Sequence, residues 1–169
     1  MIVNNLYSLP HFNERPTDSV IDTVVVHSLY CEEEADRFNL QSCVTCLDKN
    51  KVSAHFAVTQ AGEVFSLVDE GSRAWHAGAS KMPFTDDNRE NVNDFSIGIE
   101  LIGDPAQGFT GEQYRALGTL ISTLASRHPI KNVVGHDHIS PGRKVDPGPH
   151  FDWEKLSSLV GGSFRIPTR

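Results

Sequence analysis

The strongest constraint on the fold is a run of β-branched and apolar residues at positions 21–27, with the sequence IDTVVVH. The run has the length of one strand. Its continuous apolar character is typical of a strand that is buried on both faces of a sheet. The sequence therefore predicts that residues 21–27 form a central strand.

Further strands are predicted on both sides of this one in the chain. Residues 52–59 (VSAHFAVT) and 63–68 (EVFSLV) flank a short connection that contains glycine, which indicates a β-hairpin. Residues 95–102 (FSIGIELI) alternate between two faces, and residues 132–135 (NVVG) have the length of a short strand.

Helices are predicted between these strands. An apolar spacing of i, i+3, i+4 and i+7 starts at Leu40. Thr110 and Gln113 have the spacing of a capping box, and the apolar stripe after them stops at Pro129. Asp152 precedes a last helical segment, WEKLSSLV.

Interleaved strands and helices with one hairpin predict an α/β fold, with a central mixed β-sheet flanked by helices. A chain of 169 residues suits a single domain, here 1–169, with a sizeable core. We expect residues 1–20 to form an irregular N-terminal arm, residues 71–94 a long loop, and residues 161–169 a frayed tail.

Composition and charge limit the kinds of partner that this chain is expected to bind. A net charge of −7 and a pI near 5.5 argue against nucleic acid or an anionic membrane surface. No segment is long and apolar enough to span a bilayer, and the first residues lack the features of a signal peptide. Three cysteines do not suggest a disulfide framework. We therefore expect a cytoplasmic protein, and nothing in the sequence implies an obligate protein partner.

Residues 135–151, GHDHISPGRKVDPGPHF, carry the clearest candidate site. His136 and Asp146 are ordinary ligands of a divalent metal, and the proline and glycine residues stiffen the loop that holds them. His27 is the candidate third ligand, because it ends the central strand. Two histidines and one aspartate leave a fourth position open, as in catalytic zinc sites. His138 is a competing ligand.

Two further charged residues are candidates for catalysis. Glu100 lies in an apolar strand, on the same face as Gly98, which leaves room for a ligand. The alternative is an edge-strand glutamate that faces water. Lys144 stands two residues before Asp146 and would either form a surface ion pair or face developing negative charge on a substrate oxygen.

Trp75 and the cysteines allow two interpretations each. Trp75 would form a pocket wall or belong to the core. Cys43 and Cys46, with Cys31, have a spacing that suggests a zinc knuckle, but no fourth ligand lies nearby. Cys43 fits the apolar stripe of its helix, so we expect it in the core.

Several motifs together resemble a known family. PHFNERP, VVVH, KVSAHF, RAWHAG, NDFSIGIEL and GHDHISPGRKVDPGPHFDW follow one another along nearly the whole chain. They are similar to the type 2 amidases, the zinc-dependent N-acetylmuramoyl-L-alanine amidases of the AmpD type. The resemblance implies the fold that these enzymes share with peptidoglycan-recognition proteins.

The resemblance also implies roles for individual residues. One Zn²⁺ per chain would be held by His27, His136 and Asp146, which favours His136 over His138. Glu100 would activate or orient the attacking water, and Lys144 would stabilise the oxyanion. The positions that line the substrate groove in the family are here occupied by Ser28, Lys51, Trp75 and Ser140.

The implied reaction is hydrolysis of the amide bond between N-acetylmuramic acid and L-Ala of a muropeptide. The expected substrate is the 1,6-anhydro form, in cytoplasmic cell-wall recycling. Two alternatives are an exported or phage-type amidase that cuts polymeric peptidoglycan, and a non-catalytic recognition module. One groove position departs from the family: Asn91 stands where relatives often have arginine, and Arg89 is a candidate replacement.

Overall fold

The computed structural model describes residues 2–160 and 164–167. Within these residues the strands are β1 (Val3–Asn4), β2 (Phe12–Asn13), β3 (Thr23–Leu29), β4 (Phe56–Val58), β5 (Val64–Ser66), β6 (Arg73–Ala74), β7 (Ser96–Ile102) and β8 (Asn132–Gly135). The helices are α1 (Leu40–Lys49), α2 (Gly111–Ala125), α3 (His136–Ile139) and α4 (Trp153–Val160), with a 3₁₀ helix, η1, at Val92–Phe95.

The central sheet is mixed, as the sequence predicts. Its strand order is β1-β5-β4-β7-β3-β8, and β2 and β6 form a separate pair. The strands β4, β7, β3 and β8 are parallel, whereas β5 is antiparallel to β4 in the expected hairpin. Strand β3, from the apolar run, is central and has a partner on each side.

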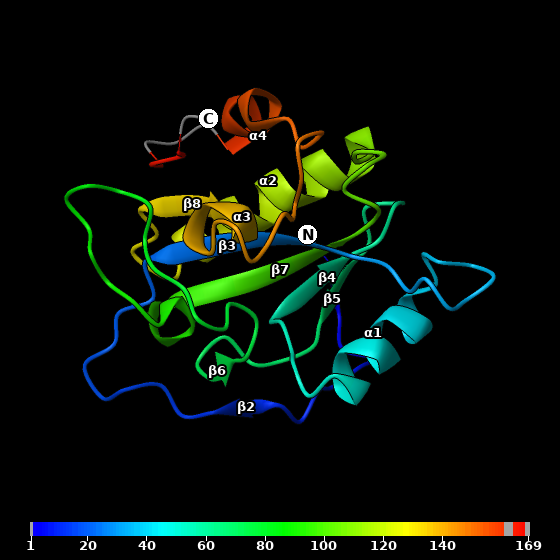
Figure 1. Cartoon of the computed structure of the whole chain (residues 1–169), viewed down its shortest axis with the longest axis horizontal. Helices are drawn as coiled ribbons and strands as arrows, with labels where there is room; N and C mark the ends of the chain where they lie inside the picture. The colour runs from blue at the N-terminus through cyan, green and yellow to red at the C-terminus, as the bar shows by residue number, and fades with distance from the viewer. Residues whose placement is uncertain (1, 161–163, 168–169) are drawn as a thin grey trace.

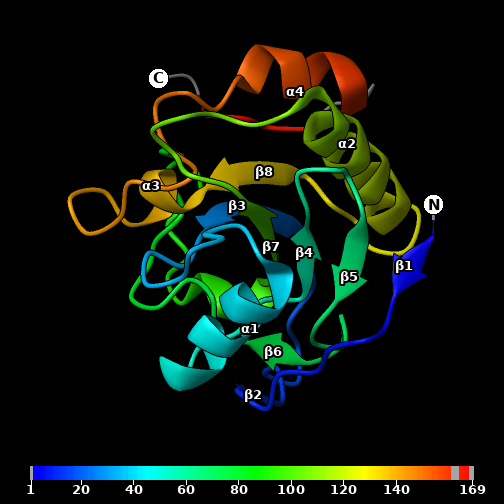
Figure 2. The same cartoon turned by 90° about the vertical axis from the view of Figure 1, so that its right-hand side faces the viewer.

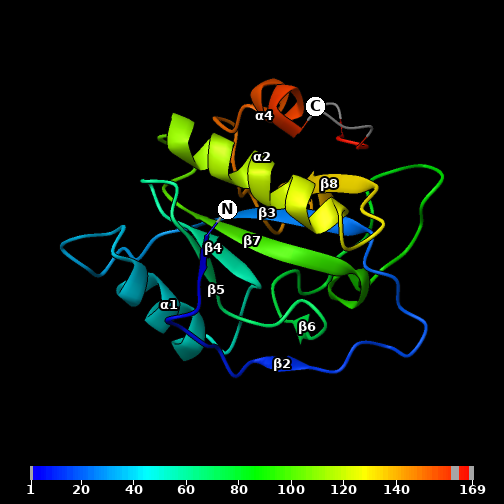
Figure 3. The same cartoon turned by 180° about the vertical axis from the view of Figure 1, so that it is seen from behind.

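Helices cover the sheet unequally. Helices α2 and α4 lie on one face, while α1 and the β2–β6 pair lie on the other (Figures 1 and 2). From behind, α2 crosses in front of the sheet (Figure 3). The apolar stripe of α2 packs there against alternate residues of the central strands, among them Val24, Val26, Ile97, Ile99 and Leu101. The opposite face packs Ala57, Phe65 and Ile102 against α1, and it also carries the buried polar side chains of His27 and Glu100.

The start of α2 is fixed to the sheet by a side chain. The predicted capping box is present, with Thr110 Oγ1 accepting from the Gln113 backbone N–H and Gln113 Oε1 accepting from the Thr110 N–H. The amide nitrogen of Gln113 also donates to the carbonyls of Val58 and Ile102. One buried side chain thus joins α2 to β4 and β7.

Several predicted segments differ in extent from the observed elements. The strand predicted at 52–59 is shorter, because the N–H groups of Ser53 and His55 bond to loop and strand carbonyls before β4 begins. The loop at 71–94 contains β6, a Lys81–Glu90 bridge and most of η1. Strand β3 continues to Leu29, and α3 was not predicted.

The two ends of the chain also hold structure. The arm at 1–20 contributes β1 to the edge of the main sheet, β2 to the small sheet and the buried Leu9 to the core. In the predicted tail, residues 161–163 and 168–169 lie outside the described residues. Residues 164–167 are not frayed, because Arg165 bridges to Asn132 and its two neighbours pack on the core.

Among the described residues, no helix has the length and apolar character needed to cross a membrane.

Candidate active site

Parallel pairing brings three candidate residues together at the carboxyl ends of neighbouring strands. In the β3–β7 ladder His27 is the partner of Glu100, so their side chains point to the same face. In the β3–β8 ladder Val26 pairs with Gly135, and His136 follows directly as the first residue of α3. These carboxyl ends of neighbouring parallel strands are where α/β folds place ligand groups.

Three side-chain atoms converge at this edge. Nδ1 of His27 lies 3.0 Å from Nδ1 of His136, and each nitrogen lies 3.2 Å from Oδ2 of Asp146. Within the described ranges this is the one group of three or more histidine, cysteine or acidic side chains with metal-site spacing. The sequence-predicted set is thus brought together, although it spans 119 positions.

The loop that carries Asp146 is held at several points. The Asp137 N–H donates to the Asp146 carbonyl over 2.8 Å. Gly142 and Gly148 have φ angles of +78° and +93°, which other residues rarely adopt. A Cβ at Gly148 would lie 2.5 Å from Pro105 Cβ, so this glycine also permits close packing. The expected stiffness of the loop follows from these contacts.

Burial and hydrogen bonding set the protonation of the converging groups. Burial, together with the neighbouring His136, lowers the pKa of His27 to about 4. Burial alone would raise the pKa of Asp146, but the close contacts with His136 and His27 outweigh it and lower that pKa below its usual range. At neutral pH the site therefore combines a neutral His27 imidazole with the Asp146 carboxylate.

Glu100 is buried beside this group. It is 6% exposed, and burial, with the nearby Asp146 carboxylate second, raises its pKa to about 8. Its Oε2 is buried without a hydrogen-bond partner among the described residues. The alternative of an edge-strand glutamate is wrong, because β7 lies between β4 and β3 in the middle of the sheet. Such a carboxyl group is suited to proton transfer near neutral pH.

These residues line one cleft of about 440 Å³. Trp75 is 37% exposed at the cleft, so the alternative of a core tryptophan is wrong. Lys144 is exposed and lines the cleft, and its ammonium has no ion-pair partner in the part of the chain that the structure describes. The surface ion pair considered for Lys144 is therefore absent from these residues.

The predicted groove residues divide into two pairs. Ser28 and Trp75 line the cleft, and Ser28 Oγ is buried without a partner among the described residues. Lys51 and Ser140 are not among the lining residues. Lys51 is exposed, with a φ of +55°, in the turn after α1. Ser140 is buried and donates to the Ala79 carbonyl.

Arg89 does not replace the groove arginine of the family. Its guanidinium forms ion pairs with Asp22 and Asp87 and lies over the ring of Phe95, outside the cleft lining. Arg143 lines the cleft instead and donates to the carbonyl of Ala77. Its place next to Lys144 in the loop was the only sequence signal for it.

His138 and the cysteines, the competing candidate ligands, lie outside the group of His27, His136 and Asp146. His138 Nδ1 accepts the Gly135 N–H over 2.9 Å, and its ring stacks on Trp153 at 5.0 Å between centroids. All three cysteines are free, and Cys43 is in the core as expected. Burial, first of all, raises the pKa of Cys43 to about 12, which disfavours the thiolate that a metal needs.

The space beside Gly98 is not open to a ligand, contrary to the expectation from sequence. A Cβ at residue 98 would lie 2.4 Å from Cγ of His76, so the His76 ring occupies this space. His76 is buried, and its Nδ1 lies 3.0 Å from Nε2 of His27. The sequence places His76 only in the long loop, because no pattern in the sequence relates it to His27.

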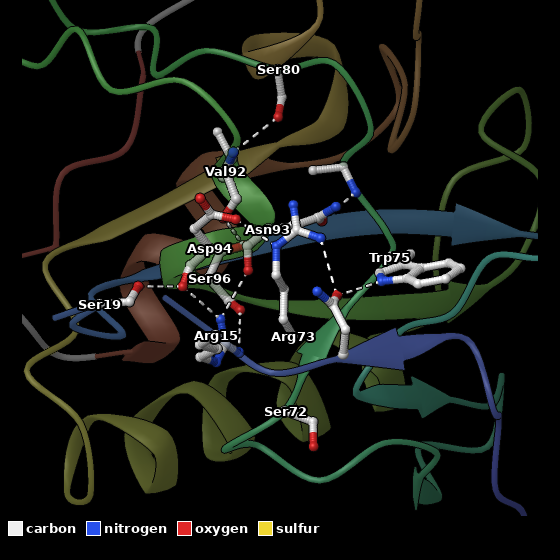
Figure 4. A network of polar contacts seen from close by, with 12 residues as sticks. Arg15, Ser19, Ser72, Arg73, Trp75, Ser80, Val92, Asn93, Asp94 and Ser96 are labelled. Carbon is white, nitrogen blue, oxygen red and sulfur yellow. Dashed lines mark hydrogen bonds and ion pairs between the residues drawn. The ribbon is translucent and has the colours of Figure 1, made fainter. Parts of the chain in front are cut away.

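Arg15 was also missed, and it bonds to several separate segments of the chain (Figure 4). Its guanidinium donates to backbone carbonyls of four residues, with distances of 2.9 to 3.4 Å. These acceptors lie in the 69–72 turn, η1 and the start of β7, at Glu70, Asn93, Asp94 and Ser96. One side chain of the N-terminal arm therefore satisfies carbonyls from separate segments.

Trp75 is held by the same network. Its indole N–H donates to Asn13 Oδ1 over 2.7 Å, and Arg73, whose Nη1 also reaches this oxygen, pairs with Asp94 (Figure 4). The cleft wall is thereby tied to β2 and η1.

The fold and this cleft define a class: α/β proteins with two histidines and one aspartate grouped at the carboxyl edge of a mixed sheet. Residues 17–149 match the N-acetylmuramoyl-L-alanine amidase family, so the chain belongs to that family. This confirms the family resemblance and the fold expected from it.

Similar proteins agree with this membership. The chain is 37% identical to the 1,6-anhydro-N-acetylmuramyl-L-alanine amidase AmpD of Citrobacter freundii, over 89% of this chain and 87% of the relative. A crystal structure of an AmpD derivative superposes with a TM-score of 0.78 at 35% identity, covering 94% of each chain. The amidase AmiD of E. coli, solved with anhydro-N-acetylmuramic acid-L-Ala-D-γ-Glu-L-Lys, gives 0.69 at 30% identity, covering 86% of this chain and 60% of AmiD.

The Arg15 network predicts a stability effect. Arg15→Lys keeps the charge but loses the planar fork that reaches several carbonyls at once, so we expect a loss of about 2–4 kcal/mol in unfolding free energy. Urea denaturation measures it. The control is Arg115→Lys, at an exposed ion pair with Glu112, with an expected change below about 0.5 kcal/mol. Equal stability of Arg15→Lys and wild type would contradict the role of Arg15.

Proposed function

We propose that this protein is a zinc-dependent amidase. It hydrolyses the amide bond between N-acetylmuramic acid, in the 1,6-anhydro form, and L-Ala of the stem peptide. The convergence of His27, His136 and Asp146 beside a buried Glu100 is the observation that carries this proposal. Family membership and the two AmpD and AmiD relatives support the choice of substrate.

The donor set suits Zn²⁺. His136 Nε2 lies 3.1 Å from the Ala77 carbonyl, which can only accept, so Nε2 carries the proton and Nδ1 keeps its lone pair. That lone pair points at His27 Nδ1 and the Asp146 carboxylate. Three acceptors within about 3 Å repel one another unless a cation lies between them. Two imidazoles, a carboxylate and an open cleft match a catalytic zinc site.

Bound zinc supplies a Lewis acid that polarises the amide carbonyl and lowers the pKa of water. Glu100 takes the proton of the attacking water and returns it to the leaving amine of L-Ala. Burial raises its pKa, and a carboxyl group with a raised pKa can serve first as base and then as acid. Its unpartnered Oε2 is the atom available for this transfer.

Lys144 stabilises the negative oxygen of the tetrahedral intermediate. It stands at the cleft two residues from Asp146, and its ammonium is not engaged by another described side chain. Arg143 and Lys144 make this part of the cleft cationic, although the chain carries a net charge of −7. An anionic muropeptide is thus attracted to the cleft rather than to the acidic surface.

For the rest of the groove, Ser28 and Trp75 are the proposed contacts, with the Ser28 hydroxyl bonding substrate and Trp75 packing on it. Lys51 reaches substrate only beyond the cleft, and Ser140 acts by supporting the loop rather than by contact. The setting that fits a soluble anhydro-muropeptide is cytoplasmic cell-wall recycling. A non-catalytic recognition module is disfavoured because all three proposed ligands and Glu100 are present.

The substrate assignment predicts a difference between two assays. Purified protein with Zn²⁺ should release free stem peptide from 1,6-anhydro-N-acetylmuramyl peptide, as detected by mass spectrometry, and a chelator should abolish the release. Release from intact sacculi should be much slower. Faster cutting of sacculi than of the soluble substrate would instead support the polymer-cutting amidase, and no cleavage of either would support a recognition module.

The ligand assignment predicts loss of metal in Asp146→Ala. Removing the only carboxylate of the set should leave well below one equivalent of zinc after dialysis and should abolish hydrolysis. Zinc content is measured by atomic absorption. His150→Ala, an exposed residue of the same loop, is the control and should keep zinc and activity. One full equivalent of zinc in Asp146→Ala would refute the assignment.

If Glu100 transfers the proton, replacing it should lower turnover without changing zinc binding. Glu100→Gln fills the same space but cannot accept a proton, so kcat should fall by about 10²–10⁴ while zinc content stays at one equivalent. Glu154→Gln, on the exposed side of α4, serves as the matched control. If Glu100→Gln retained more than a tenth of the wild-type kcat, Glu100 would not be the proton-transfer group.

A further inference from the structure

The His76 ring lies behind His27, and both of its nitrogens have partners. Nδ1 lies 3.0 Å from Nε2 of His27, and Nε2 lies 3.1 Å from Oγ of Ser96. The rings of His76 and His27 meet edge to face at 5.1 Å between centroids. Because the ring fills the space above Gly98, it has little freedom to turn.

The Val92 carbonyl, at one end of this series of hydrogen bonds, determines which nitrogen of each ring carries the proton. Ser96 Oγ lies 2.6 Å from the Val92 carbonyl, which has no proton, so the single hydroxyl proton of Ser96 points there. Ser96 Oγ must then accept from His76, which places the His76 proton on Nε2. Neutral His76 is left with a lone pair on Nδ1, and this lone pair accepts the Nε2–H of His27.

Both rings are buried and in contact with each other. Each neutral imidazole carries one N–H. With its proton on Nε2, His27 presents the lone pair of Nδ1 toward His136 and Asp146.

The same short segment fixes both histidines of the group. The residue after His76, Ala77, accepts from His136 Nε2. The backbone N–H groups of His76 and Ala77 both donate to Asn93 Oδ1, at 3.2 and 2.8 Å. Asn93 lies in η1 next to Val92 (Figure 4). One 3₁₀ turn therefore anchors the partners of both imidazoles.

We propose that His76 and Ser96 are positioning residues that hold the proton of His27 on Nε2, so that its Nδ1 is ready to bind the metal before the metal arrives. This inference rests on the proposed zinc site. Outer partners of metal-binding histidines commonly fix the tautomer and ring orientation in this way. In this chain the partner is a second histidine, whose own tautomer is set by a serine and a backbone carbonyl.

A packing role alone would leave the tautomer of His27 unaffected. Three variants distinguish the two roles. His76→Leu keeps the bulk of the side chain but removes the acceptor for His27. His76→Asn places an amide oxygen near the position of Nδ1. Ser96→Ala removes only the hydroxyl that accepts from His76 Nε2. Ser80→Ala is the matched control, because Ser80 also bonds a backbone group of Val92 but touches neither histidine.

Two measurements on the whole protein test the proposal. The first is the affinity of metal-free protein for Zn²⁺, by competition with a chelating dye. The second is the tautomer of His27, from ¹⁵N NMR of the histidine side chains in the metal-free protein. Neither measurement depends on amide hydrolysis.

We expect His76→Leu to bind Zn²⁺ about 10- to 100-fold more weakly and to show a mixture of His27 tautomers. His76→Asn should recover most of the affinity, Ser96→Ala should shift the tautomers in the same direction as His76→Leu, and Ser80→Ala should match wild type. If His76→Leu does not fold, Ser96→Ala decides, since it keeps every ring in place.

The proposal is overturned if His27 in the His76→Leu variant still carries its proton on Nε2 alone. If His76→Leu does not fold, the same result in Ser96→Ala overturns the proposal. Unchanged Zn²⁺ affinity in that variant would overturn it equally. Failure of wild type to bind Zn²⁺ would instead refute the proposed zinc amidase, and the tautomer measurement would still decide the role of His76.

Discussion

The in-register parallel pairing of β3 with both β7 and β8 is the constraint on which the site depends. It sets His27 opposite Glu100 and directs the chain from Gly135 straight into His136. A slip of one residue in either ladder would turn these side chains to the opposite face, against α2. Because that face is filled by the apolar core, the register that buries the core also assembles the site.

Polar groups buried beneath the sheet edge need partners, and irregular segments supply them. Arg15 satisfies carbonyls of the 69–72 turn, η1 and β7, and Asn93 satisfies the N–H groups of residues 76 and 77. The long loop and the N-terminal arm are therefore ordered by the same contacts that orient His76 and Trp75. Stability of this region and geometry of the cleft are consequently linked, since loosening η1 would release both histidine partners.

The sequence by itself determined the fold class, the order of most elements and the family. Continuous apolar character at residues 21–27 predicts a central strand, and the alternation in residues 95–102 separates a core face from a polar face. The stiff loop at 135–151 marks His136, Asp146 and Lys144 as a cluster within one segment. These features were predictable because they rest on local periodicity and on residues close together in the chain.

Tertiary structure alone decided which distant side chains serve as partners. His76 occupies the space that the sequence left open beside Gly98, and Arg89 is held by Asp22 and Asp87 rather than by the cleft. Arg15 shows the same limit, since its acceptors lie 55 to 81 positions away. Hydrogen bonds at such separations leave no periodic pattern, because they depend on how loops cross the sheet. The sequence thus determined which residues are candidate metal ligands, and the packed loops decided how their imidazoles are oriented.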